Sequence, residues 1–182
     1  MRVITGSARG RKLKELSGME TRPTTDKVKE SIFNIIQFDI EGRKVLDLFA
    51  GTGQLGIEAL SRGSKSAVFV EQRREAANLV KENLKLTSLQ ERGSVVQGDA
   101  LSYLSTCRET FDVIFLDPPY QTALLENALK SIAAFDILSK NGIIVCESDS
   151  ERVLPALDAP YEKGKDYRYG KIKLTLYRRK PE

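Results

Sequence analysis

The sequence predicts a doubly wound α/β fold, in which a mostly parallel sheet carries helices on both faces. Two observations indicate this fold: apolar runs of strand length alternate with amphipathic helical stretches, and a glycine-rich turn follows the first run. With 182 residues and 41% apolar side chains, the chain has the size of one domain with a sizeable core. We expect residues 1–182 to form a single domain, with a basic N-terminal arm over residues 1–25 and a core over residues 26–182.

The first elements in chain order are a small basic hairpin and a helix. The opening 16 residues contain Gly6 and Gly10, which are available for the turns of a hairpin. Apolar residues then recur at helical spacing after the capping residues Thr24 and Thr25, so we expect a helix from Asp26 to Ile36.

The rest of the core alternates between strands and helices. The runs expected to form parallel strands are Lys44 to Phe49, Ala67 to Val70, Ser94 to Gln97, Phe111 to Leu116 and Ile143 to Glu147. The strongest helical stretches between them are Leu55 to Arg62, Arg73 to Leu86 and Leu124 to Phe135. Ile172 to Tyr177 alternates apolar and polar residues after Tyr169-Gly170, which predicts a last strand paired antiparallel through a turn.

Composition excludes several classes of protein. The two cysteines, Cys107 and Cys146, are isolated, so we expect neither a disulfide framework nor a metal site. The chain has no histidine, which removes the commonest general base. No apolar run approaches the roughly 20 residues of a membrane helix, and the N-terminus lacks the apolar run of a secretion signal. We therefore expect a cytoplasmic monomer without a membrane partner.

Positive charge is concentrated at the two ends of the chain. Residues 1–30 hold eight basic and four acidic side chains, and residues 161–182 hold eight basic and three acidic ones, whereas the segment between them has a net charge of −5. This distribution suits basic arms that meet a polyanion such as nucleic acid. A lysine-rich solvated surface is an equal alternative on charge alone.

A glycine-rich turn follows the first predicted strand. It reads Ala50-Gly51-Thr52-Gly53-Gln54-Leu55-Gly56. Glycine lets the backbone turn tightly and lets a ligand approach without a Cβ in the way. The pattern by itself also fits a dinucleotide site or a turn without a ligand.

Acidic residues at three successive strand ends favour S-adenosylmethionine as the ligand. Asp47 would repel a diphosphate but suits the cationic amine and sulfonium of this cofactor. Glu71 can accept hydrogen bonds from both ribose hydroxyls, and Asp99 can accept from the adenine amino group, with the Ala100 N–H donating to a ring nitrogen. Asp99 is equally well placed as a helix N-cap. The expected cofactor-binding residues are Asp47, Phe49, Gly51, Gly53, Glu71, Asp99 and Ala100.

The tetrapeptide Asp117-Pro118-Pro119-Tyr120, after the fourth strand, indicates the reaction. A proline pair is an ordinary way to end a strand, but this leaves the flanking Asp and Tyr unexplained. An exocyclic amine on a purine is a poor nucleophile, and acceptors at the Asp117 carboxylate and the Pro118 carbonyl would favour a pyramidal, reactive nitrogen. The prolines stiffen the turn, and Tyr120 offers a stacking face for a base, worth roughly 1 to 3 kcal/mol. We expect Asp117, Pro118 and Tyr120 to be the catalytic residues, acting mainly by positioning.

Over almost its whole length the chain resembles the bacterial 16S ribosomal RNA guanine-N2 methyltransferases. The segments that carry the resemblance are Arg2 to Gly6, Arg9 to Leu13, Arg22 to Asn34, Asp47 to Gly53, Leu55 to Ala59 and Asp117 to Tyr120. It implies a Rossmann-like, seven-stranded class I methyltransferase sheet, S-adenosylmethionine as cofactor, and 16S ribosomal RNA within a small ribosomal subunit or its assembly intermediate as substrate. Gln54 departs from the small residue expected at its position.

The basic arm is the expected contact for RNA. The residues expected to bind substrate are Arg9, Arg11, Lys12, Arg22 and Thr24. An adenine-N6 methyltransferase on DNA or RNA would use the same tetrapeptide, and a glutamine-directed protein methyltransferase would use related acceptors. A non-catalytic RNA-binding assembly factor is an alternative from another class, and a dinucleotide oxidoreductase would leave Asp47 without a role.

Overall fold

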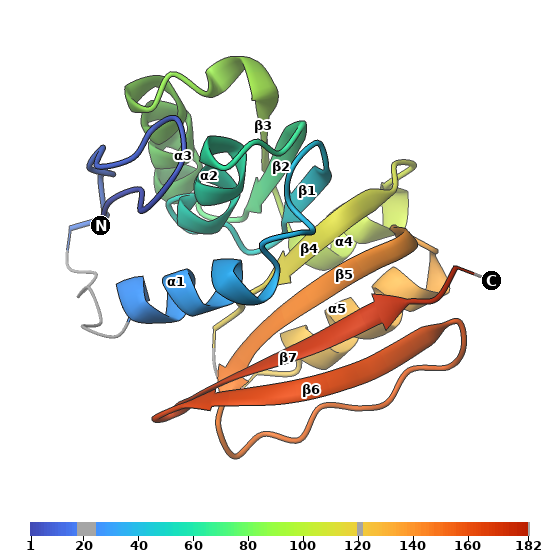
Figure 1. Ribbon diagram of the computed structural model, residues 1–182. Coiled ribbons are helices and arrows are strands. Elements are labelled where there is room, and N and C mark those ends of the chain that lie inside the picture. The colour runs from blue at the N-terminus through green and yellow to red at the C-terminus, as the bar shows by residue number, and fades with distance from the viewer. Residues whose placement is uncertain (18–24, 120–121, 182) are drawn as a thin grey trace.

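Seven strands form one mixed sheet in the computed structural model, which describes residues 1–17, 25–119 and 122–181 (Figure 1). In chain order they are β1 (Lys44–Asp47), β2 (Ser66–Glu71), β3 (Gly93–Gln97), β4 (Phe111–Leu116), β5 (Leu138–Asp149), β6 (Tyr161–Tyr169) and β7 (Ile172–Arg179). Their order across the sheet is β3-β2-β1-β4-β5-β7-β6. The first five strands run parallel, while β7 is antiparallel to both β5 and β6. The predicted fold class and the antiparallel final hairpin are confirmed.

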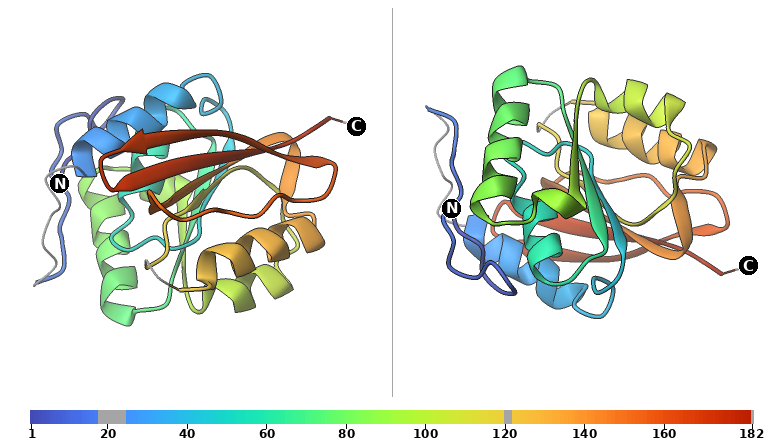
Figure 2. Two further views of the ribbon diagram at one scale, coloured as in Figure 1. Left: turned by 90° about the horizontal axis from the view of Figure 1, so that it is seen from below. Right: turned by 90° about the horizontal axis from the view of Figure 1, so that it is seen from above.

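Helices cover both faces of this sheet. Their bounds are α1 (Thr25–Ile35), α2 (Gln54–Ser61), α3 (Arg74–Leu86), α4 (Ala100–Thr106) and α5 (Leu124–Ala134), with a short 3₁₀ turn, η1 (Gln90–Arg92). Buried side chains of α1, α2 and α3 pack on one face, and those of α4 and α5 pack on the other, as the two views of Figure 2 also show. The sheet is therefore the middle layer of three.

Alternation along the central strands supplies both cores. In β4, Val113 and Phe115 face the first core, whereas Ile114 and Leu116 face the second. All four are at most 1% exposed, which explains why the strand reads as an unbroken apolar run. A strand buried on both faces in this way belongs in the centre of a parallel sheet, where β4 lies.

The strand bounds differ from the expected ones where neighbouring strands extend or end the pairing. The strand expected over Ile143 to Glu147 runs from Leu138 to Asp149, because β7 pairs with it as far as Asp149 and β4 reaches its start at Leu138. The first strand ends at Asp47 rather than Phe49, since the chain turns there into the glycine loop. The bounds of α4 and of β6, the partner of the last strand, were not predicted, because α4 has only seven residues and β6 is largely exposed.

The predicted N-terminal hairpin is present, with a single backbone bridge between Arg2 and Lys12. The Val3 amide donates to the Arg11 carbonyl at 2.9 Å. Gly6 and Gly10 turn the chain with φ values of 94° and 84°, a region that favours glycine.

This hairpin is docked onto the core rather than extended into solvent. Val3, Ala8 and Leu13 are buried in the same core as α2 and α3. The fully buried Glu58 of α2 accepts the Ile4 amide at 2.9 Å and the Thr5 amide at 3.0 Å. A side chain at Gly6 would collide with the Ser61 carbonyl, 1.9 Å from an ideal Cβ. The described part of the arm is thus packed into the folded core. The charge of the arm alone did not predict this packing.

None of the helices in the described ranges combines the length and the apolar character that crossing a lipid bilayer requires.

Candidate cofactor and substrate cavity

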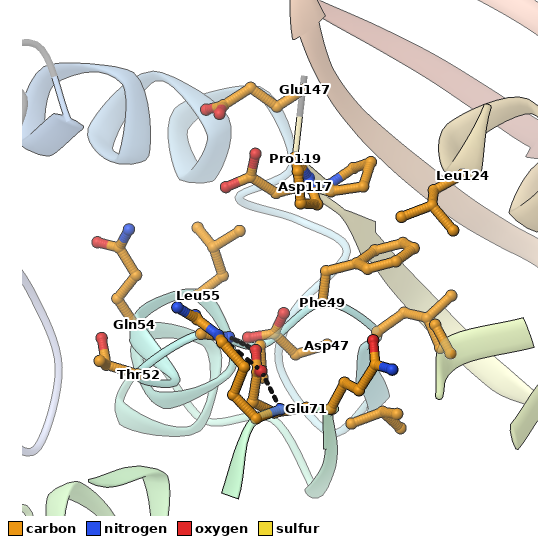
Figure 3. Close-up of a pocket in the computed structure, with 18 of the residues that line it drawn as sticks. Asp47, Phe49, Thr52, Gln54, Leu55, Glu71, Asp117, Pro119, Leu124 and Glu147 are labelled. Carbon is orange, nitrogen blue, oxygen red and sulfur yellow. Dashed lines mark hydrogen bonds and ion pairs between the residues drawn. The ribbon is translucent and has the colours of Figure 1, made fainter. Parts of the chain in front are cut away.

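A cavity of about 510 Å³ lies beyond the carboxyl ends of the parallel strands. In the sheet, β1 stands between β2 and β4, so strand order reverses there and leaves a crevice at this edge. Residues from the first strand loop, from the ends of β2 and β3, and from the turn after β4 all line the same cavity (Figure 3). Its volume is in the range of small-molecule sites, roughly 300 to 1,000 Å³.

Asp47 lies at the base of the cavity, where β1 ends. It is 2% exposed, and its Oδ2 accepts the Gly56 amide of α2 at 3.0 Å. Burial raises the pKa of Asp47 to about 7, assisted by repulsion from Glu71 and opposed by the Gly56 hydrogen bond. A cation bound beside this carboxyl would restore its charged form, so the site favours a positively charged ligand.

Glu71 holds the glycine loop as well as lining the cavity. Its Oε1 accepts the Gly51 amide at 2.9 Å, and its Oε2 accepts the Arg73 amide at 2.8 Å and the Arg73 Nε at 3.2 Å. Each carboxylate oxygen has two acceptor positions, so Oε2 is filled and Oε1 can still accept from one hydroxyl group of a ligand. The sequence predicted the ligand contact but not this support of the loop.

The two first glycines of the loop have different surroundings. Gly51 lines the cavity with a φ of 59°, and an ideal Cβ there would meet nothing within 4 Å. Gly53 has a φ of 89°, and an ideal Cβ there would lie 3.1 Å from Val80 Cγ1. Among the described residues, those lining the cavity do not include Gly53, so its part is to turn the chain and permit close packing.

Asp99 caps a helix and also lies at the cavity. Its Oδ2 accepts the Ser102 amide at 2.9 Å and so caps α4, while the residue also lines the cavity with Ala100 and Gly98. Phe49 lines the cavity between Asp47 and Pro119 in Figure 3. Six of the seven expected cofactor residues therefore lie around one space.

The polar groups that line this cavity fit S-adenosylmethionine. Gln54 lines it, and the buried Gln54 Oε1 has no hydrogen-bond partner in the described part of the chain. An orphaned acceptor in the same cavity as the acidic Asp47 calls for a ligand that donates hydrogen bonds and carries positive charge. Asp47, Gln54 and Glu71 would hold the amino-acid and ribose parts, and Asp99 with Ala100 the adenine.

The turn after β4 forms another side of the cavity. Asp117 is half-buried, Pro118 is buried, and both line the cavity together with Pro119. Leu48 and Phe115 are linked by a backbone hydrogen bond of 3.3 Å, which holds the ends of β1 and β4 side by side. Asp117 is thereby in the same cavity as Asp47. Tyr120, Arg22 and Thr24 lie outside the described residues.

Arg152, which follows β5, anchors the segment after this turn. Arg152 donates to the Thr122 carbonyl and forms a two-pronged ion pair with Glu126 of α5, with Nε to Oε1 at 2.8 Å and Nη2 to Oε2 at 2.5 Å. The Thr122 hydroxyl donates to the Pro119 carbonyl at 3.0 Å. Arg152 lowers the pKa of Glu126, which keeps the pair ionised. The turn is thus fixed at its C-terminal side by packing that no local motif revealed.

Sequence reasoning missed four charged residues that line the cavity, namely Glu15, Lys29, Arg73 and Glu147, of which Lys29 of α1 and Glu147 of β5 lie on regular elements of the core. Lys29 is 1% exposed, donates to the Arg2 carbonyl at 2.8 Å and lies 3.6 Å from Glu58. Burial lowers its pKa. A lysine on an apolar helix face was a detectable signal, whereas Glu147 at the end of a strand resembled any other polar terminus.

The arm reaches the rim of the cavity. Met1 and Glu15 line it, whereas Arg9, Arg11 and Lys12 are exposed on the hairpin. Arg11 donates to the Leu86 carbonyl at the end of α3 at 2.9 Å. The structure therefore places the three predicted RNA-binding cations apart from the predicted catalytic turn, on an element that borders the same opening.

The mixed seven-stranded sheet, with acids at the ends of β1, β2 and β3 and an Asp-Pro-Pro turn after β4, defines the class I methyltransferases. Within this class, the chain belongs to the family described as Conserved hypothetical protein 95, whose model matches residues 1–178.

Three relatives illustrate the similarity. YlbH of Bacillus subtilis is 45% identical over 99% of this chain and 100% of its own. The ribosomal RNA small subunit methyltransferase D of Escherichia coli is 34% identical over 100% of this chain and 91% of its own. The solved structure of yhhF from Escherichia coli superposes with a TM-score of 0.90 at 34% identity, covering 100% of this chain and 99% of that one. Both the fold class and the family expected from the sequence are confirmed.

Proposed function

We propose that this protein transfers a methyl group from S-adenosylmethionine to the exocyclic N2 amine of a guanine in 16S ribosomal RNA. The observation that carries the proposal is one continuous cavity, in which the acids of β1, β2 and β3 meet Asp117 and Pro118. The relatives named ribosomal RNA small subunit methyltransferase D support the same substrate class.

The chemistry asks little of the protein beyond positioning. S-adenosylmethionine, when bound, supplies an electrophilic methyl group and leaves as a neutral thioether, and the methylated amine loses one proton to solvent. The Asp117 carboxylate and the Pro118 carbonyl each accept a hydrogen bond from one N–H group of the target amine. These two bonds direct the nitrogen lone pair away from the ring and toward the cofactor end of the cavity. A half-buried and a buried acceptor on a proline turn need little reorganisation, so most of the rate enhancement comes from positioning the amine at a reactive distance, roughly 3 to 3.5 Å.

The proposed substrate is 16S ribosomal RNA in a small subunit or an assembly intermediate, bound by a monomer in the cytoplasm. The exposed Arg9, Arg11 and Lys12 support an RNA contact, because cations on one surface supply most sequence-independent affinity for phosphates. We include Arg22, Thr24 and Tyr120 in the proposed substrate site on the basis of their positions in the sequence. The whole chain acts as one domain, since the arm and the core share buried residues.

The experiment that tests this proposal is methyl mapping. Small subunits from cells that lack the enzyme are incubated with the purified protein and a labelled methyl donor, and the labelled nucleotide is identified. We expect one guanine of 16S RNA to carry the label on N2. Label on adenine N6, on a ring carbon or on a sugar would contradict the proposal.

A further inference from the structure

We propose that Glu147 recognises the N1–H of the target guanine and selects it against purines whose N1 is an acceptor. This inference rests on the proposed transfer to guanine N2 and adds to it a residue that decides which base is accepted. The turn after β4 can hold any exocyclic amine, so another group must tell guanine from adenine.

The position of Glu147 follows from strand pairing. Cys146 of β5 pairs in register with Leu116 of the parallel strand β4, and one residue further along the two strands come Glu147 and Asp117. Both residues are half-buried and both line the cavity. Figure 3 shows their side chains next to each other at one end of the cavity, with the two carboxyl groups turned to the same side. Asp117 directly follows β4 and Glu147 lies near the end of the adjacent strand β5, so two carboxylates flank the place of the proposed target base.

Two neighbouring negative charges suit a ligand edge that is rich in N–H donors. An ionised carboxylate only accepts hydrogen bonds, so two carboxylates at one end of a cavity offer acceptors to such an edge. Guanine presents such an edge, since its N1–H lies directly beside the two N–H bonds of N2. With Asp117 and Pro118 accepting from N2, Glu147 is the acceptor on the adjoining strand for N1–H.

The same arrangement rejects adenine. The ring nitrogen beside the adenine amine, N1, carries a lone pair instead of a hydrogen, and a carboxylate facing it meets electron density without a bond. A site built to accept a substrate N–H discriminates strongly against analogues that lack it, because its own polar group is left unpaired. Glu147 therefore supplies the choice of base that the tetrapeptide does not.

The test uses 2-aminopurine, which keeps the N2 amine of guanine but has an unprotonated N1. Small subunits are reconstituted with RNA that carries either guanine or 2-aminopurine at the mapped position, and single-turnover methylation rates are measured. We expect the wild-type protein to prefer guanine by about 100-fold or more. In Glu147→Gln, whose amide can donate to N1 of 2-aminopurine, we expect this preference to shrink at least tenfold.

Glu109→Gln is the matched control, because Glu109 precedes β4 at the opposite end of the strand and is exposed. It should keep the wild-type preference, and calorimetry should show unchanged cofactor binding in both variants. An unaltered guanine preference in Glu147→Gln overturns the role of Glu147 while leaving guanine-N2 transfer standing. Failure of the wild-type protein to methylate guanine at all removes the proposed function, and this inference with it.

Discussion

The cavity has two halves, which we call the cofactor half (Asp47, Glu71 and Asp99) and the base half (Asp117 and Glu147) after their proposed ligands. The two halves hold their carboxylates in different ways. In the cofactor half, each acid accepts a backbone amide from the element that it helps to shape: Asp47 from Gly56, Glu71 from Gly51, and Asp99 from Ser102. In the base half, Asp117 directly follows β4 and Glu147 lies within the paired strand β5, and the turn between β4 and α5 is anchored by Arg152.

This difference determines what a substitution can reveal. An acid of the cofactor half is part of the loop structure as well as part of the site, so its loss affects folding and binding together. The turn of the base half is also held by prolines and by the Arg152–Glu126 pair, and these supports remain when Asp117 is changed. The base half should therefore separate chemistry from stability, and the cofactor half should not.

The largest expected effect is that of Asp117→Ala in the base half. Asp117 is the proposed hydrogen-bond acceptor for the target amine. Its removal should lower the methyl-transfer rate constant by about 1,000-fold, because the loss of one group that stabilises a transition state has effects of this size. Cofactor affinity should change less than about threefold. Single-turnover transfer and calorimetric cofactor binding measure the two quantities separately.

Glu126→Gln serves as the control for the anchor of the same turn. It keeps the size of the side chain but weakens the ion pair with Arg152. We expect a much smaller loss of rate than for Asp117→Ala, about tenfold or less. Near-normal turnover of Asp117→Ala would show that another group binds the amine.

The next effect in size is that of Asp47→Asn in the cofactor half. Loss of the charge should weaken binding of the cationic cofactor by roughly 10- to 100-fold at pH 8, the usual scale for a hydrogen bond to a charged group. Because the pKa of Asp47 is about 7, wild-type affinity should fall as the pH drops from 8 to 6, while the affinity of the variant stays flat. Calorimetry across this pH range checks both slopes.

The same variant should be more stable than the wild-type protein without cofactor. The folded pKa of Asp47 is raised from 3.8 to about 7, so its carboxyl costs stability that grows as the pH rises from 4 to 7. Asn cannot ionise and its Oδ1 can still accept from Gly56. Denaturant unfolding should show a gain on the order of 2 to 4 kcal/mol at pH 8 that disappears near pH 4. A gain at pH 4 as large as at pH 8 would contradict the buried-charge explanation.

A third prediction concerns the link between the arm and the cofactor half. The buried Asn83 of α3 accepts the Lys14 amide at 2.7 Å and donates to the Lys14 carbonyl at 3.1 Å and the Thr52 carbonyl at 2.9 Å. Asn83→Ala leaves these buried groups unpaired, which costs about 2 kcal/mol of stability and loosens the glycine loop. We expect cofactor affinity to fall about tenfold and protease cleavage within the arm to accelerate. Full cofactor affinity with a released arm would show that the loop does not depend on this contact.

Much of the fold and of the cofactor half was predictable, because the determining signals are local. A strand, a glycine turn and a helix in succession fix where Asp47 must lie, and the parallel order brings Glu71 and Asp99 to the same edge. Asp117 was found for the same reason, since it directly follows an apolar strand.

What escaped prediction depends on contacts between distant residues. Glu147 joins the site only because β5 pairs in register with β4, and Arg152 reaches Thr122 across about 30 positions of sequence. The docking of the arm depends on Glu58 and Asn83. In the sequence, nothing distinguishes these two from other polar helix residues, because their partners lie in the distant hairpin. Such long-range partners have no periodicity or motif that would identify them.

The smallest predicted effect belongs to the arm surface. Arg9 and Lys12 are exposed, so replacing both by Gln should leave folding and cofactor binding unchanged. Each lost phosphate contact lowers the slope of log affinity against log salt by roughly 0.7 to 0.9, so the pair should reduce it by about 1.5 and weaken RNA-particle binding several-fold at low salt.

Lys130→Gln with Lys140→Gln removes two exposed cations from α5 and β5, and should leave the slope as it was. Arg11 is kept because it also holds the end of α3, and its replacement would combine a structural loss with an electrostatic one. A slope unchanged by the Arg9 and Lys12 replacements would assign the arm to folding alone, since its buried residues already account for its docking on the core.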